Sequence, residues 1–147
     1  MADEKQFCTF FLDDLFWGVE VLQVQEVFRD QEVTEVPLAP PVVKGLINLR
    51  GQIITAIDLR RRLELGEHPS GKPPMNVVVR TSDGVVSLLV DEIGDVLEGP
   101  AESYERVPDS VNGLTRDLVK GVYKLKDQLL LILDTEKGAQ VEGTVSA

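Results

Sequence analysis

The stretch that decides the fold is Val43-Lys44-Gly45-Leu46-Ile47-Asn48-Leu49-Arg50-Gly51-Gln52-Ile53-Ile54-Thr55-Ala56-Ile57-Asp58, because a second version of it occurs 76 positions later, at residues 119–134. The two versions are identical at six aligned positions, and apolar residues face each other in most of the gaps. The identical pairs are Val43/Val119, Lys44/Lys120, Gly45/Gly121, Leu49/Leu125, Gln52/Gln128 and Asp58/Asp134. Such a repeat indicates that one supersecondary unit is used twice.

The repeat extends upstream at a slightly shorter offset. Residues 21–27 lie 69 positions before residues 90–96, and a hairpin pattern precedes both, at residues 7–19 and 75–90. The order of hairpin, apolar link, Val-Pro, Gly-led hairpin and Asp therefore occurs twice. We expect a single domain of two pseudo-repeated lobes, about 7–66 and 75–136. The Pro/Gly-rich stretch 67–74 is the expected junction between them.

Composition and charge set the outer limits. At 147 residues the chain fits one ordinary domain, and a lobe of half that size would be marginal alone, so we expect the halves to fold against each other. Aromatic residues make up only 5%, and a core of Val, Leu and Ile favours strands. The net charge of −10 argues against binding nucleic acid or inserting into an anionic membrane.

Three features bear on the cellular compartment. Cys8 is the only cysteine and has no internal disulfide partner, and no apolar run reaches the roughly 18 residues of a membrane span. The N-terminal residues do not have the form of a signal peptide. We therefore expect a cytoplasmic protein. The basic residues concentrate between Lys44 and Arg62, where they form a candidate steering surface for a partner.

Local patterns predict many short strands. Apolar runs around Asp13-Asp14 and around Arg50-Gly51 predict hairpins, and residues 21–28 favour a short helical turn that runs into a strand. Residues 59–65 predict a short basic helix, residues 118–125 and 128–133 another hairpin, and residues 137–147 a flexible tail. Short strands at regular turn spacing indicate small barrels or a sandwich.

The search for catalytic chemistry finds no convincing site. His68 stands alone in the junction and reads as a solvated loop residue, while Cys8 reads as a small core residue without a base. The glycines are spread singly and make no phosphate-binding loop, and acid pairs such as Asp91-Glu92 read as a solvated face. We expect neither an enzyme nor a cofactor or metal site.

The clearest functional signal is the difference between the two copies. The first hairpin tip reads Asn48-Leu49-Arg50-Gly51, whereas the second reads Lys124-Leu125-Lys126-Asp127. Only the first combines an amide, a guanidinium and a glycine, and the planar guanidinium suits carboxylates or helix-end carbonyls. The residues alone leave open that Arg50 is a plain turn residue and that Asn48 pairs locally.

A family resemblance covers residues 7 to about 136. The run from Lys44 to Arg60 resembles the CheW signature K-G-x-x-N-L-R-G-x-[IV]-[IV]-x-x-[IV]-D-L-R. Residues 21–27 and 90–97 are similar to the family elements I-x-x-V-Q-E-[IV] and V-D-x-[IV]-x-[DE]-V-L. The chain departs from the family in two places. Many members have Pro at Thr55 or a neighbouring position, and many have an amphipathic C-terminal helix where this chain has a polar tail.

The resemblance implies a mostly β fold of two intertwined five-stranded SH3-like barrels with short helices. It also implies a non-enzymatic adaptor of bacterial chemosensory arrays on the inner face of the membrane, monomeric when free. The implied partners are the regulatory domain of a CheA-type histidine kinase and the cytoplasmic tip of a methyl-accepting chemoreceptor. The residues we assign to these contacts are Val24, Glu26, Gly45, Asn48, Arg50 and Gly51.

Two alternatives to this function stay open at the level of sequence. One is a CheW-like adaptor of a pathway other than chemotaxis, such as twitching motility. The other is a small ligand-binding β-barrel, which would require a pocket with converging polar groups.

Overall fold

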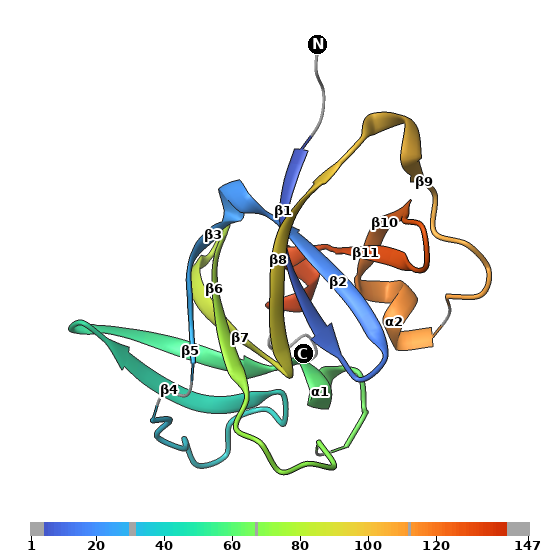
Figure 1. Cartoon of the computed structure of the whole chain (residues 1–147). Coiled ribbons are helices and arrows are strands. Elements are labelled where there is room, and N and C mark those ends of the chain that lie inside the picture. The colour runs from blue at the N-terminus through green and yellow to red at the C-terminus, as the bar shows by residue number, and fades with distance from the viewer. Residues whose placement is uncertain (1–4, 30–31, 67, 112, 141–147) are drawn as a thin grey trace.

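The computed structural model describes residues 5–29, 32–66, 68–111 and 113–140, and within them the chain forms two β-sheets with short helices (Figure 1). Sheet A has the strand order β8-β1-β2-β11-β10-β9, and sheet B the order β3-β6-β7-β5-β4. The strands of sheet A are β1 (Lys5–Leu12), β2 (Leu15–Glu20), β8 (Glu92–Gly99), β9 (Tyr104–Glu105), β10 (Val119–Lys124) and β11 (Leu129–Leu133). Those of sheet B are β3 (Val24–Phe28), β4 (Val43–Leu49), β5 (Gln52–Asp58), β6 (Met75–Thr81) and β7 (Gly84–Val90). The helical segments are η1 (Val21–Gln23), α1 (Leu59–Arg62), η2 (Ala101–Ser103), α2 (Gly113–Leu118) and α3 (Thr135–Gly138).

Each sheet takes strands from both copies of the repeat. Sheet B combines β3, β4 and β5 of the first copy with β6 and β7 of the second, and sheet A combines β1 and β2 with β8, β10 and β11. Parallel pairing of β5 with β7 and of β11 with β2 joins the copies. The mostly β, intertwined fold class is thus confirmed, with two-residue β9 as a sixth strand of sheet A. The expected lobes, residues 7–66 and 75–136, are halves of the repeat in the sequence, and each sheet contains strands from both.

The repeat is also visible in how each Gly-led hairpin ends. Asp58 accepts hydrogen bonds from two backbone N–H groups of α1 at 2.9 and 3.2 Å, and Asp134 accepts one from α3 at 3.2 Å. The backbone N–H groups of these residues donate to Val42 and Leu118, both at 2.8 Å. An aspartate at the N-cap satisfies donors that a helix start leaves unpaired, so the shared aspartate is a structural cap in both copies.

The hydrophobic core has three parts. The largest fills the space between the sheets, and each sheet also encloses a smaller cluster of its own. The inter-sheet part includes Phe10, Trp17, Ile57, Val77 and Leu88. The cluster within sheet B contains Ile47, Ile54 and Ala56, whose repeat equivalents Tyr123, Leu130 and Ile132 belong to the cluster within sheet A. Because the largest part needs both sheets, neither sheet buries its apolar faces alone.

Most predicted hairpins are confirmed, but three predictions need correction where the structure forms short helices. The basic helix expected over residues 59–65 is a single turn, α1, after which Glu64 adopts a φ of 56°. Leu118 was expected in a strand but ends α2, which the sequence did not predict. Lys137 was expected in the flexible tail but belongs to α3. Gly138 of that predicted tail also belongs to α3, and residues 141–147 of it lie outside the described residues.

Gly45 has a structural reason to be glycine. Its φ is +157°, and a Cβ atom there would lie 2.6 Å from Val33 Cγ1 and closer still to the carbonyl oxygen of Thr34. Thr34 bridges to Leu46 with hydrogen bonds of 2.8 Å in both directions. The segment after β3 therefore packs directly on the backbone of β4, which leaves no room for a side chain.

We predict that Gly45→Ala lowers the free energy of unfolding by about 2–3 kcal/mol, because the backbone contact with Thr34 must open. Gly51→Ala is the matched control. Gly51 also has a positive φ, +89°, but open space surrounds its missing Cβ, so we expect a loss of about 1 kcal/mol. Urea unfolding of the three proteins measures both values. Equal losses for the two variants would contradict the packing role of Gly45.

We predict that brief proteolysis cleaves first within residues 67–74, and that the fragments then stay associated. Sheets A and B each contain strands from both sides of this cut, so separation would break every parallel pairing. Gel filtration after digestion, compared with electrophoresis under denaturing conditions, measures association. Fragments that separate and remain folded would refute a core shared by both copies.

Candidate protein-interaction site

An exposed ion pair lies at the tip of the β4–β5 hairpin. The Arg50 guanidinium hydrogen-bonds the carboxylate of Glu26, which lies on β3. Strands β3 and β4 are the two edges of sheet B, and the pair connects them across the open side. The Arg50 side chain is 71% exposed and that of Glu26 25%, so one face of the guanidinium remains open to solvent. The structure thus brings together two of the residues that the sequence singled out.

The geometry of the β4–β5 turn gives Asn48 and Gly51 a structural role. Arg50 and Gly51 both have positive φ, 54° and 89°, as the favoured two-residue hairpin turn requires. The Asn48 side-chain oxygen accepts a 2.8 Å hydrogen bond from the Gly51 N–H. Asn48 and Gly51 therefore fix the shape of the tip, and the left-handed backbone of Arg50 directs its side chain toward Glu26.

The other two predicted residues lie deeper. Val24 is half-buried and packs against the inter-sheet core, and its carbonyl oxygen accepts a 3.4 Å hydrogen bond from Arg80. Gly45 is buried beneath Thr34 and acts through packing. Four of the six residues therefore gather at the exposed end of sheet B, while Val24 and Gly45 support the strands that carry them.

Two exposed apolar side chains lie on β3 and β5, the strands next to this ion pair, and the sequence analysis did not single them out. Ile53 is 60% exposed and lies directly across from Asn48 in the β4–β5 register. Val27, next to Glu26 on the edge strand β3, is 41% exposed. A signal for Ile53 was present in the sequence, because β5 alternates and places it on the face opposite the buried Ile54. An isoleucine on that face is either covered by a partner or left in water.

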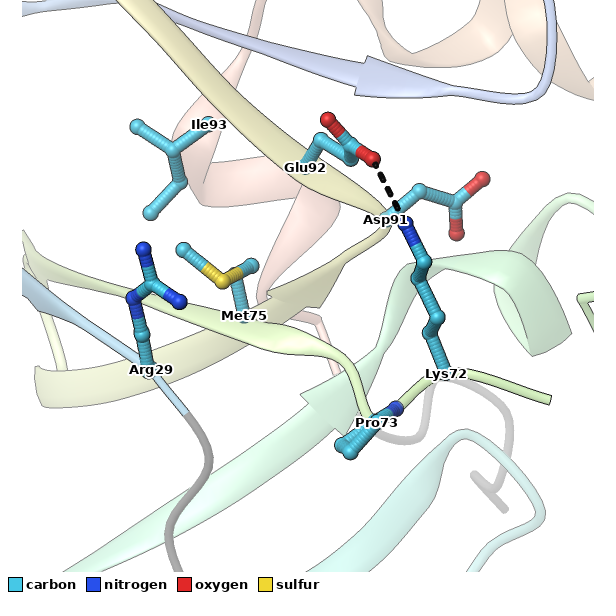
Figure 2. Close-up of a pocket in the computed structure, with 7 residues that line it drawn as sticks. All are labelled: Arg29, Lys72, Pro73, Met75, Asp91, Glu92 and Ile93. Carbon is cyan, nitrogen blue, oxygen red and sulfur yellow. Dashed lines mark ion pairs between the residues drawn. The ribbon is translucent and has the colours of Figure 1, made fainter. Parts of the chain in front are cut away.

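The two sheets also meet at a cavity of about 390 Å³, at the ends of β3, β6 and β8 (Figure 2). Met75 and Ile93 form its apolar wall, Arg29 lies on one side, and the Lys72–Glu92 ion pair, 3.7 Å long, lies on the other. Its mixed lining includes no histidine or cysteine. A ligand could be held there, but the lining residues provide no nucleophile and base pair.

Arg60 carries the main buried polar contact of the molecule. Its Nη1 donates to Asp13 at 2.7 Å and to Asp91 at 2.6 Å, and its Nε donates to the Gly66 carbonyl at 2.8 Å. The Asp91 side chain is only 6% exposed and also accepts the Asp13 N–H at 2.8 Å. Burial alone would lower the pKa of the Arg60 guanidinium, but the hydrogen bonds and charges of the two aspartates outweigh it and raise the pKa.

This contact corrects three readings of the sequence. The Lys44–Arg62 segment is not one exposed basic surface, because Arg60 is buried and paired. Asp91 is not part of a solvated face. His68 is not fully solvated either, since its side chain is 33% exposed and its Nε2 lies 3.7 Å from Asp91. These groups meet only in three dimensions, so local patterns in the sequence could not pair them.

Within the described part of the chain, no group of three or more His, Cys, Asp or Glu side chains is arranged to hold a metal ion. Cys8 is half-buried, and this burial raises the pKa of its thiol above the usual value, which disfavours the reactive thiolate. No helix among the described residues is long and apolar enough to cross a bilayer.

Comparison with known proteins identifies the family. The model of the CheW-like domain matches residues 6–142. The chain belongs to the CheW family. Members of this family are non-catalytic scaffold proteins, and this chain is not an enzyme.

Similar proteins support this assignment in sequence and in structure. The chain is 29% identical to chemotaxis protein CheW of Treponema pallidum, covering 92% of this chain and 82% of that one. It is 30% identical to CheW of Klebsiella aerogenes, covering 90% and 80%. Protein PilI of Pseudomonas aeruginosa is 25% identical, with 87% and 71% covered. The crystal structure of the scaffolding protein TtCheW from Thermoanaerobacter tengcongensis superposes with a TM-score of 0.85 at 29% identity, covering 97% of both chains.

We predict that Arg60→Ala lowers the free energy of unfolding by about 3–5 kcal/mol, because it leaves the buried carboxylate of Asp91 without its cation. Arg61→Ala is the matched control. The Arg61 side chain is 46% exposed and only 3.6 Å from Asp58, so its loss should cost less than about 1 kcal/mol. Chemical denaturation of both variants provides the comparison. A loss for Arg60→Ala no larger than that for Arg61→Ala would contradict the role of this contact.

Proposed function

We propose that this chain is an adaptor that couples the cytoplasmic tip of a chemoreceptor to the regulatory domain of a CheA-type histidine kinase. The family supports a scaffold role, and several similar proteins are chemotaxis proteins named CheW. The observation that carries the proposal is the exposed Glu26–Arg50 pair on sheet B, with exposed apolar residues on the neighbouring strands β3 and β5. A solvent-exposed pair of this kind contributes little to stability and is available to a partner.

The second copy of the repeat provides an internal comparison. The residue equivalent to Arg50 is Lys126, and the one equivalent to Glu26 is Asp95. Among the described residues, Asp95 and Lys126 form no ion pair with each other, and in sheet A the short strand β9 covers β10, whereas β4 is an edge of sheet B. The Glu26–Arg50 pair is thus particular to the first copy, where the hairpin edge is uncovered, and this supports a role in binding for the pair.

The chemistry of the tip suits a helical partner. The open face of the Arg50 guanidinium can hydrogen-bond a carboxylate or the last carbonyls of a helix. Ile53 on β5 and Val27 on β3 supply exposed apolar area on the strands next to the pair, which the apolar face of a helix can cover. In this proposal Glu26 and Arg50 make direct contacts, Asn48 and Gly51 hold the tip in shape, and Val24 and Gly45 fix the strands beneath.

The same proposal includes the cellular location and the oligomeric state of the protein. The chain works in the cytoplasm, at receptor arrays on the inner face of the membrane, and is monomeric when free. A scaffold that links two partners needs a separate surface for each. Sheets A and B, built on the same repeat, offer two surfaces of related shape but different side chains.

A second candidate is an adaptor of a related pathway other than chemotaxis, such as twitching motility. One similar protein, Protein PilI, carries a name other than CheW, and this similarity favours a related adaptor role. Both candidates use the same scaffold, so the partners distinguish them. Affinity purification of the tagged chain from its own cells, with identification of the co-purifying receptor and kinase, decides between the two.

We predict that Arg50→Ala changes the free energy of unfolding by less than about 1 kcal/mol, as is usual for an exposed site. The same change should weaken binding to a receptor-tip fragment or to the kinase regulatory domain by about 1.5–3 kcal/mol, the range for a charge-assisted hydrogen bond. Arg50→Lys should recover part of that loss, because it keeps the charge but not the planar fork. A melting curve and a binding titration measure the two effects.

Two further variants sharpen this test. Lys126→Ala, at the equivalent tip of the second copy, is the matched control for the loss of one basic side chain from a hairpin turn. The double variant Glu26→Arg with Arg50→Glu keeps an ion pair within the protein but places the carboxylate, in place of the guanidinium, at the exposed hairpin tip. We therefore expect its binding to the partner to be as weak as that of Arg50→Ala. Unchanged affinity of Arg50→Ala for both partners, with the fold intact, would refute the proposed site.

A further inference from the structure

Basic side chains line a second cavity of about 370 Å³, which shares Lys72, Pro73 and Asp91 with the cavity of Figure 2. This second cavity lies between α1, the end of β5 and the segment that leads into β6. Lys44 reaches it from β4, Arg61 from α1, and His68 and Lys72 from the connecting segment. Its volume falls in the range of small-molecule sites, roughly 300–1,000 Å³.

The two carboxylates of this cavity are already engaged. Asp58 caps α1 through backbone N–H groups of that helix and lies 3.6 Å from Arg61 Nε. Asp91 accepts from Arg60 Nη1 at 2.6 Å and from the Asp13 N–H at 2.8 Å. Both carboxylates thus already have N–H or cationic partners within the protein. Arg60 and Arg61 are the partners of these carboxylates, so Lys44 and Lys72 are the cations of the lining that neither carboxylate holds.

Lys44 is the most informative of these cations. Among the described residues no carboxylate lies within ion-pair distance of it, although it is half-buried. Its repeat equivalent, Lys120, pairs with Glu20 at 3.5 Å. Lys72 is held only by a 3.7 Å contact with Glu92, in which both side chains are more than half exposed. Such a pair is weak and readily exchanged for a stronger anion.

We propose that this cavity binds a phosphate-bearing small molecule through Lys44 and Lys72, with the half-exposed guanidinium of Arg61, which Asp58 and the Pro41 carbonyl hold in place, beside them. Several cations around one small cavity suit a group with more than one negative charge, and ammonium and guanidinium donors both form charge-assisted hydrogen bonds to phosphate oxygens. The site lies on α1 and the connecting segment, apart from the Glu26–Arg50 tip, and does not depend on the proposed adaptor function.

Isothermal titration of the full chain with sodium pyrophosphate, at low ionic strength and with chloride-matched buffer, tests the proposal. We expect one saturable site. Lys44→Ala and Lys72→Ala should each weaken binding about tenfold, the loss expected for one charge-assisted hydrogen bond. Lys120→Ala removes the same charge from the equivalent position of the second copy and should leave the affinity unchanged. Melting curves show that each variant is folded.

A second arm separates the possible sources of the phosphate. Titration with ATP at the same ionic strength gives tighter binding than pyrophosphate if the ligand is a nucleotide, and equal or weaker binding if it is an inorganic or sugar phosphate. The absence of a saturable site for either probe, or an equal loss in Lys120→Ala, would overturn the proposal. Displacement of bound pyrophosphate by a receptor-tip peptide would also overturn it and assign the cavity to protein carboxylates.

Discussion

The contact of Arg60 with Asp91 and Asp13 is the interaction on which the arrangement of the two sheets depends. Arg60 lies on α1, which follows β5 of sheet B, whereas Asp13 lies in the β1–β2 turn of sheet A. Asp91 lies where the chain leaves β7 of sheet B and enters β8 of sheet A. A single buried cation therefore joins both sheets and one of the two crossovers between them. In the second copy, Glu136 has the same place in the repeat and accepts from the N–H and hydroxyl of Ser82, at 2.9 and 2.8 Å.

Comparison of the two copies of the repeat also shows which residues build the fold and which residues are specific to one copy. The aspartates that cap α1 and α3 are identical in the two copies, and so are the glycines near the start of β4 and β10. The hairpin tips differ, as do the basic residue of α1 and its acidic equivalent in α3. Two related sheets can in this way keep one scaffold and present different chemistry, which a protein that connects unlike partners requires.

Much of the fold could be predicted from the sequence, because hairpins, caps and the repeat are local patterns. The helical turn before β3 and the turn at Arg50-Gly51 follow from residue type and spacing. Helix α2 could not be predicted in this way. Arg116 holds it by donating to the carbonyls of Val107, Pro108 and Val111, contacts that exist only once the preceding loop is folded. For the candidate site, the sequence pointed to Glu26 and Arg50 separately, but their pairing required the closure of sheet B.

Each sheet combines strands from both copies of the repeat, and this has a consequence for synthesis of the protein. Strand β2 pairs in parallel with β11, so Trp17 meets its partner Leu131 only after nearly the whole chain has left the ribosome. Until then β2 presents an unpaired edge, and such edges can associate with other chains. Pairings between distant residues also form slowly, since loop closure must precede the contacts that reward it. During most of its synthesis the nascent chain therefore has an apolar strand with an unpaired edge. A chaperone that covers this edge would prevent association with other chains.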